Sequence, residues 1–142
     1  MRKKIISTIF IVLIIISISG MKCNPSEESF VEVWRTDIGE CKKCNIIKGE
    51  KVIIVLSDYK KLISLDHTTG EILWKNELEH SIYNSITLHN RMLFLGDSEG
   101  NLTAINPGTG KEKWSIKIDQ AFQTGITFHD NTIYCGAGYS IY

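Results

Sequence analysis

The sequence predicts an all-β protein that is built from a repeated structural unit, and three observations support this prediction. Trp34, Trp74 and Trp114 lie 40 residues apart, and the segments that begin at these tryptophans align without a gap. Within each period the apolar runs are short, and turn residues separate them. This pattern is typical of strands joined by hairpins and not of helices.

The alignment of the periods preserves residue classes along its whole length. Apolar positions, glycines and turn residues coincide, which indicates a structural repeat. The matched sets include Ile46, Ile86 and Ile126; Ile53, Leu93 and Ile133; Leu62 and Leu102; and Gly96 and Gly136.

Each period has room for four strands. In the second period we expect them at residues 85–88, 92–95, 102–105 and 111–114. A period of about 40 residues with four strands has the size of one β-propeller blade. We therefore predict a partial β-propeller of about two and a half four-stranded blades over residues 33–142, preceded by an N-terminal signal helix.

The third repeat stops at Tyr142, where its third strand begins. Repeat arrays need about three or more stacked units and capped ends for stability. We therefore expect the chain to be completed either by further blades or by a second copy of itself.

The residues of the turns between the third and fourth strands are of types that stabilise tight turns. Asp66 and Asn106 can accept hydrogen bonds from backbone amides two or three residues later. Gly70 and Gly110 supply the positive φ that closes such a hairpin, and Pro107 presets φ within the turn. These polar residues are therefore predicted to be structural.

Residues 64–74 and 104–114 resemble the tryptophan-docking motif of the pyrroloquinoline-quinone-like (PQQ-like) propeller repeats. In that motif a small residue comes first, an Asp or Asn and a Thr-Gly pair form the turn, and a tryptophan closes it. The resemblance implies that each indole ring lies flat between neighbouring blades, above the small residue, and a buried indole N–H needs a hydrogen-bond partner. The motif residues are Trp34, Ser64, Asp66, Thr69, Gly70, Trp74, Ala104, Asn106, Thr109, Gly110 and Trp114.

The PQQ-like family includes quinone-dependent dehydrogenases, an assembly lipoprotein of the Bam complex, and sensor or adhesion modules, so membership does not settle function. The enzyme members imply calcium-binding carboxylates, an aspartate base and often adjacent cysteines. This chain has no adjacent cysteines, and Asp58, Asp97 and Asp119 show no calcium-loop spacing. We therefore expect neither enzymatic activity nor a bound cofactor.

The N-terminus has the layout of a secretory signal. Arg2, Lys3 and Lys4 precede an apolar run at residues 5–18, and small residues follow. A membrane span needs about 20 apolar residues, so the run favours a removed signal at residues 1–22, with a tether at residues 23–32, over an uncleaved anchor.

Cys23 follows the apolar run and precedes a polar stretch, which resembles the lipidated cysteine of a bacterial lipoprotein. Gly20 and Lys22 depart from the usual residues before such a cysteine. Cys23 is therefore either a lipid attachment site or an ordinary free cysteine.

Cys41 and Cys44 have the only spacing that suggests redox or metal chemistry. A reactive thiol pair needs a helix N-terminus, and a structural zinc site needs a second pair, whereas Cys135 lies in an apolar strand and is predicted to be core. For an exported protein we expect a local disulfide, with free thiols or a metal as the alternatives. A disulfide requires a turn or bulge, because residues three apart on a strand are about 10 Å apart.

Lys and Arg together number 16, and so do Asp and Glu, so no strong field favours nucleic acid as a partner. The sequence therefore predicts a non-catalytic exported module, periplasmic or membrane-associated, that binds other proteins as a scaffold at the cell envelope. The alternatives are the N-terminal part of a PQQ-dependent dehydrogenase and a sensor ectodomain held by an uncleaved anchor.

Overall fold

The computed structural model describes residues 32–130, 132–138 and 140–141. The predicted signal helix, Cys23 and nearly all of the predicted tether lie outside these residues. The chain forms two units, Met1–Glu40 and Cys41–Tyr142. Residues 32–40 of the first unit have no regular secondary structure, and Arg35 pairs with Glu32 there at 2.9 Å.

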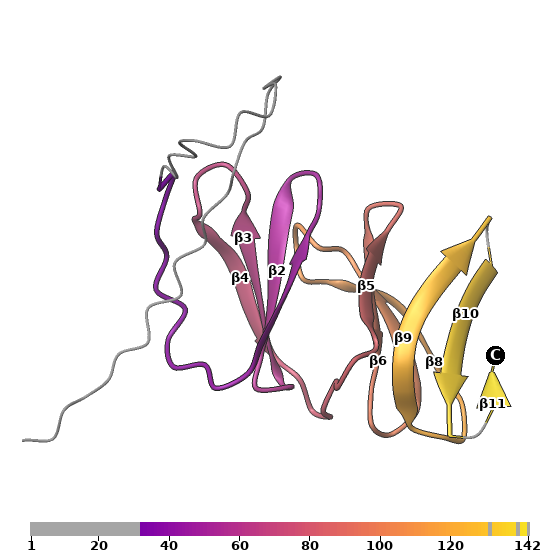
Figure 1. Ribbon diagram of the computed structural model, residues 1–142. Helices are drawn as coiled ribbons and strands as arrows, with labels where there is room; N and C mark the ends of the chain where they lie inside the picture. The colour runs from indigo at the N-terminus through magenta and orange to yellow at the C-terminus, as the bar shows by residue number, and fades with distance from the viewer. Residues whose placement is uncertain (1–31, 131, 139, 142) are drawn as a thin grey trace, which may run out of the picture. The chain divides into compact units, whose positions relative to one another are not determined.

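The second unit is all-β, as predicted, and its strands form three antiparallel sheets (Figure 1). We call these sheets blades 1, 2 and 3. Blade 1 consists of β1 (Cys44–Lys48), β2 (Val52–Ser57), β3 (Lys61–Asp66) and β4 (Ile72–Glu77); blade 2 of β5 (Ile86–His89), β6 (Met92–Gly96), β7 (Asn101–Ile105) and β8 (Glu112–Lys117); and blade 3 of β9 (Phe122–His129), β10 (Thr132–Ala137) and β11 (Ser140–Ile141).

Consecutive strands are neighbours within every blade, and the first strands of successive blades lie beside one another. β1 contacts β5, and β5 contacts β9. This arrangement is that of successive propeller blades, with β1, β5 and β9 as inner strands and β4 and β8 as outer strands.

The strands of blade 2 lie where the sequence predicts them, except at the outer edge. β8 ends at Lys117, three residues after the predicted end at Trp114, because Ser115, Ile116 and Lys117 continue the pairing with β7. All six residues of β8 are exposed. Trp114 and Ile116 alternate with polar residues, so the sequence did carry a signal that the strand continues past Trp114.

Among the described residues, two apolar clusters lie between neighbouring blades, one between blades 1 and 2 and the other between blades 2 and 3. Leu93 and Leu95 of β6 pack into the first cluster, with residues of blade 1. Phe94, between them, packs into the second cluster with Phe122 of blade 3. Alternate side chains of a strand point to opposite faces, so blade 2 is buried on both sides.

Cys135 is also part of the second cluster, as predicted, with 6% of its surface exposed. Burial raises the pKa of its thiol. Across the described ranges, no helix is long and apolar enough to cross a membrane.

Candidate functional site

The Trp74 side chain joins blade 1 to blade 2. Its Nε1–H donates a 2.8 Å hydrogen bond to the carbonyl oxygen of Pro107, and the hydroxyl of Ser64 donates to the same oxygen at 2.9 Å. Gly110 lies against the ring, since an added Cβ there would be 2.9 Å from a ring carbon. The turn between β7 and β8 is therefore attached to blade 1 by two donors and a close ring contact.

This turn, residues 106–110, is also held together by its own hydrogen bonds, and we call it the docked turn. The Oδ1 atom of Asn106 accepts from the amides of Gly108 at 3.0 Å and Thr109 at 3.1 Å. Gly110 has a φ of 69°, a conformation that glycine adopts without strain. The docked turn is thus a rigid piece of surface.

The equivalent turn of blade 1 has the same construction. Asp66 Oδ1 accepts from the amides of Thr68 at 2.8 Å and Thr69 at 2.9 Å. These backbone hydrogen bonds, that of Thr69 first, lower the pKa of the Asp66 carboxyl. Gly70 has a φ of 75°.

Trp114 has the same motif as Trp74 but different surroundings. Trp74 is half-buried, whereas the Trp114 side chain is 39% exposed and lies 5.9 Å from the Phe94 ring. Its pairing partner is Ala104, which lacks the hydroxyl of Ser64. Its indole N–H makes no hydrogen bond within the described part of the chain. Trp34 lies in the first unit, where it is half-buried.

A groove opens between blades 1 and 2, beside the docked turn. It has a volume of about 780 Å³ and is lined by residues 48–52, 88–91 and 106–108. These segments are the β1–β2 turn, the β5–β6 turn with the end of β5, and the docked turn. Segments from two blades, blade 1 and blade 2, therefore form the groove.

The groove has an apolar floor and a basic rim. Val52 and Pro107 are buried in its wall, and Leu88 is half-buried. Its charged side chains, listed together, are Lys48, Lys51, Arg91 and Glu50. The lining thus carries three cations and one carboxylate.

One ion pair crosses the groove from blade to blade. Arg91 Nε lies 3.7 Å from Glu50 Oε2, and the two side chains are 87% and 77% exposed. Such an exposed and loosely spaced pair contributes about 1 kcal/mol or less.

The β5–β6 turn presents Arg91 in an unusual conformation. Asn90 and Arg91 have φ values of 46° and 61°, so this two-residue hairpin is a type I′ turn, in which glycine is preferred at the second position. Arg91 was not among the site residues predicted from the sequence. A signal was present, because Lys51 and Arg91 occupy equivalent positions in the 40-residue repeat.

The structure joins Cys41 and Cys44 by a disulfide, with Cα atoms 6.2 Å apart. The chain bends at residues 42 and 43, directly before β1. Asp58 Oδ1 accepts from the amides of Lys42 at 3.0 Å and Lys43 at 3.1 Å, and these bonds, that of Lys43 first, lower the pKa of the Asp58 carboxyl. Asp58 therefore holds the bend that the bridge requires.

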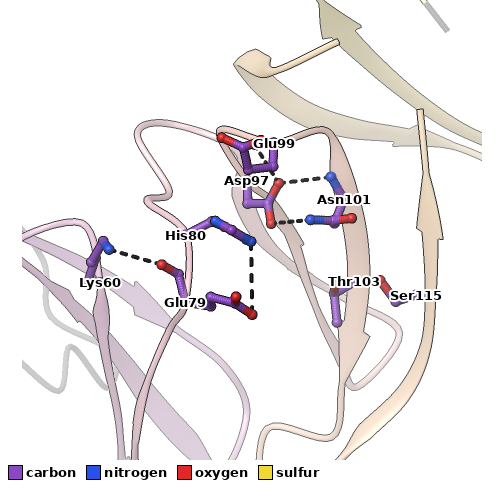
Figure 2. A network of polar contacts seen from close by, with 8 residues as sticks. All are labelled: Lys60, Glu79, His80, Asp97, Glu99, Asn101, Thr103 and Ser115. Carbon is purple, nitrogen blue, oxygen red and sulfur yellow. Dashed lines mark hydrogen bonds and ion pairs between the residues drawn. The ribbon is translucent and has the colours of Figure 1, made fainter. Parts of the chain in front are cut away.

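Another carboxylate, Asp97, closes a turn (Figure 2). Its Oδ1 accepts from the amides of Glu99 at 2.9 Å and Asn101 at 2.8 Å, and its Oδ2 accepts from Asn101 Nδ2 at 2.7 Å. Nearby, Lys60 Nζ donates to the carbonyl of Glu79 at 2.9 Å. These contacts stabilise connections between strands and leave no converging set of acids.

A calcium site of the kind that the resemblance to the enzyme members implies needs several oxygen ligands close together. Within residues 32–130, 132–138 and 140–141, no group of three or more His, Cys, Asp or Glu could hold a metal ion. Asp58 and Asp97 already accept backbone hydrogen bonds.

Comparison with known families agrees with the predicted repeat. Residues 26–138 match a family model of PQQ-like repeats that is described as outer membrane protein assembly factor BamB. The chain belongs to this family. No curated protein sequence gave a significant match.

Several solved structures resemble the chain in fold. BamB from Moraxella catarrhalis has a TM-score of 0.62 at 17% identity, over 76% of this chain and 33% of BamB. The computationally designed Ika4 protein has a TM-score of 0.61 at 17% identity, over 72% of this chain and 64% of Ika4. A quinohemoprotein alcohol dehydrogenase from Pseudomonas putida has a TM-score of 0.55 at 16% identity, over 66% of this chain and 16% of that enzyme. The chain thus spans about a third of the length of the BamB structure.

Proposed function

We propose that this chain is a non-catalytic, exported β-propeller module that acts as a protein-interaction scaffold at the cell envelope. The observation that carries the proposal is the groove between blades 1 and 2, which is formed by turns and the adjoining strand ends on a rigid frame. Loops positioned by a rigid scaffold are the usual place for binding residues.

The attachment of the docked turn supports a binding role. Trp74 and Ser64 both donate to Pro107, so one wall of the groove is already ordered before any partner arrives. Pre-ordered surfaces lose less conformational entropy on binding and so bind more tightly for the same contacts. The family description, which names an outer-membrane assembly factor, agrees with a scaffold role.

The N-terminal residues and the family support the proposed compartment. The basic start, the short apolar run and Cys23 support export through a signal at residues 1–22, with lipid attachment at Cys23 as the means of membrane association. In this proposal the mature protein faces the periplasm and reaches its partners from the membrane surface.

The alternative of a quinoprotein dehydrogenase has less support. The enzymes among the structural neighbours share the fold at 15–16% identity, and the described residues offer no cluster of ligands for their cofactor. A sensor ectodomain would differ by retaining the apolar N-terminal run in the mature chain.

Photocrosslinking in the native host tests the proposal. A photoreactive residue at Asn90, on the groove rim, should yield a crosslink to one discrete protein partner. In that crosslinked complex, this chain should lack its signal at residues 1–22. The matched control is the same residue at Lys113, which is exposed on β8. The proposal is wrong if no exposed turn position yields a crosslinked protein, or if the protein stays in the cytoplasm with its N-terminus intact.

A further inference from the structure

We propose that the groove between blades 1 and 2 binds a short acidic segment of the partner protein, with an apolar side chain on the groove floor and carboxylates at its rim. This inference rests on the proposed function and names the chemistry of the partner. Three features of the groove carry it: its charge, its crossing ion pair and its apolar floor.

The charge of the groove is local and does not reflect composition. Acidic and basic residues balance over the whole chain, at 16 each. In the groove Lys48, Lys51 and Arg91 face a single carboxylate, that of Glu50. A surface with an excess of one sign favours a partner of the opposite sign and speeds its encounter.

The ion pair across the groove shows that a carboxylate fits beside Arg91. Glu50 already places one there, at 3.7 Å from Nε. Because both side chains are largely exposed and the spacing is long, the pair is weak. A carboxylate of the partner can therefore replace that of Glu50 at little free-energy cost, and it would gain the guanidinium as a bidentate partner.

The apolar floor of the groove favours a partner segment that has an apolar side chain between its carboxylates. Leu88 is half-buried there, and Gly49 lies against it, since an added Cβ at Gly49 would be only 3.2 Å from Leu88 Cδ1. Val52 and Pro107 complete the apolar wall. A partly exposed apolar floor between charged residues gains free energy when an apolar side chain covers it.

Peptide binding by the purified full chain tests this inference. The probes are two labelled peptides of equal length, one alternating Glu with Leu and Gly and the other alternating Lys with Leu and Gly, measured by fluorescence polarisation. We expect the acidic peptide to bind at least about tenfold more tightly, which corresponds to about 1.4 kcal/mol, and to weaken as salt is added.

Three variants and one control locate the binding. Arg91→Ala should weaken the acidic peptide about tenfold, and Glu50→Gln should strengthen it about threefold, because the guanidinium is then free. Gly108→Phe should abolish binding by filling the groove; Gly108 does not have a positive φ, and its Cβ would meet only Asn106 Oδ1, at 3.5 Å. Lys113→Ala, an exposed cation outside the groove, should leave the affinity unchanged.

Several results would overturn the inference. These are equal affinity for both peptides, an unchanged affinity in Arg91→Ala and Gly108→Phe, or binding of phosphatidylglycerol vesicles that the acidic peptide does not displace. In the last case a lipid surface would be the occupant. If crosslinks to a protein partner persist in the Gly108→Phe protein, the scaffold function stands and only the assignment of this groove fails.

Discussion

The comparison of Trp74→Ala with Trp114→Ala offers a sharp test of the docking geometry. Both tryptophans close the same motif, but Trp74 is half-buried and donates a 2.8 Å hydrogen bond to Pro107, whereas Trp114 is 39% exposed. The two substitutions remove the same atoms from equivalent strands. Any difference between the two losses in unfolding free energy therefore measures how much the contact with blade 2 stabilises Trp74.

The expected magnitudes follow from burial and hydrogen bonding. Truncating a fully buried tryptophan costs about 3–5 kcal/mol, so a half-buried ring accounts for about 2 kcal/mol. The lost hydrogen bond adds about 1 kcal/mol. Pro107 keeps its bond from the Ser64 hydroxyl, so its carbonyl is not left unpaired. We expect a loss of about 3 kcal/mol for Trp74→Ala and about 1 kcal/mol for Trp114→Ala.

Urea titration followed by far-UV circular dichroism measures both losses, because removing a tryptophan would disturb a fluorescence signal. Trp74→Phe serves as a second variant if Trp74→Ala does not fold; it keeps most of the ring, loses the N–H and should cost about 1 kcal/mol. Since Trp74 and Ser64 share one acceptor, the double variant with Ser64→Ala should be non-additive. Equal losses for Trp74→Ala and Trp114→Ala would refute the reasoning.

Three further predictions concern pH, redox state and export. Backbone hydrogen bonds lower the pKa of Asp66, so its contribution to stability should be present above its ordinary pKa of about 4 and be lost as the pH falls through its lowered pKa; Asp66→Asn should flatten this acid dependence in urea titrations. Cys41 and Cys44 should resist alkylation in the exported protein until a reductant is added, and full alkylation without reductant would contradict the disulfide. Mass spectrometry of the native protein should show that the signal is absent. If Cys23 is lipidated, Cys23→Ser should release the protein into a soluble extracytoplasmic pool. Unchanged fractionation of this variant would count against lipidation.

The blade architecture could be predicted from the sequence because it depends on local patterns. The 40-residue spacing of the tryptophans, the short apolar runs and the turn residues all act within one period. Asp66 and Asn106 each accept the amide hydrogen bonds expected of their turns. The extent of the outer strand β8 was mispredicted, although the alternation of Trp114 and Ile116 with polar residues continues past the predicted end.

The groove could not be predicted in the same way. Lys51 and Arg91 stand at equivalent repeat positions, but the repeat alone does not bring Glu50 within 3.7 Å of Arg91 or place the docked turn beside both. Those distances depend on how closely blades 1 and 2 pack. The apolar cluster between the blades sets that spacing through residues such as Leu56, Leu62 and Leu93.

The sequence by itself therefore determined the all-β class, the repeat, the strand positions and the turn chemistry, because hydrogen bonds and side-chain alternation within a blade involve neighbours in the chain. Only the tertiary structure decided which tryptophan is covered and where a binding surface forms. Trp74 and Trp114 have matching motifs, yet the carbonyl that receives the Trp74 N–H lies 33 residues further along the chain, on the next blade. Contacts of that range come from the packing of one blade against another, and a pattern confined to one period does not contain them.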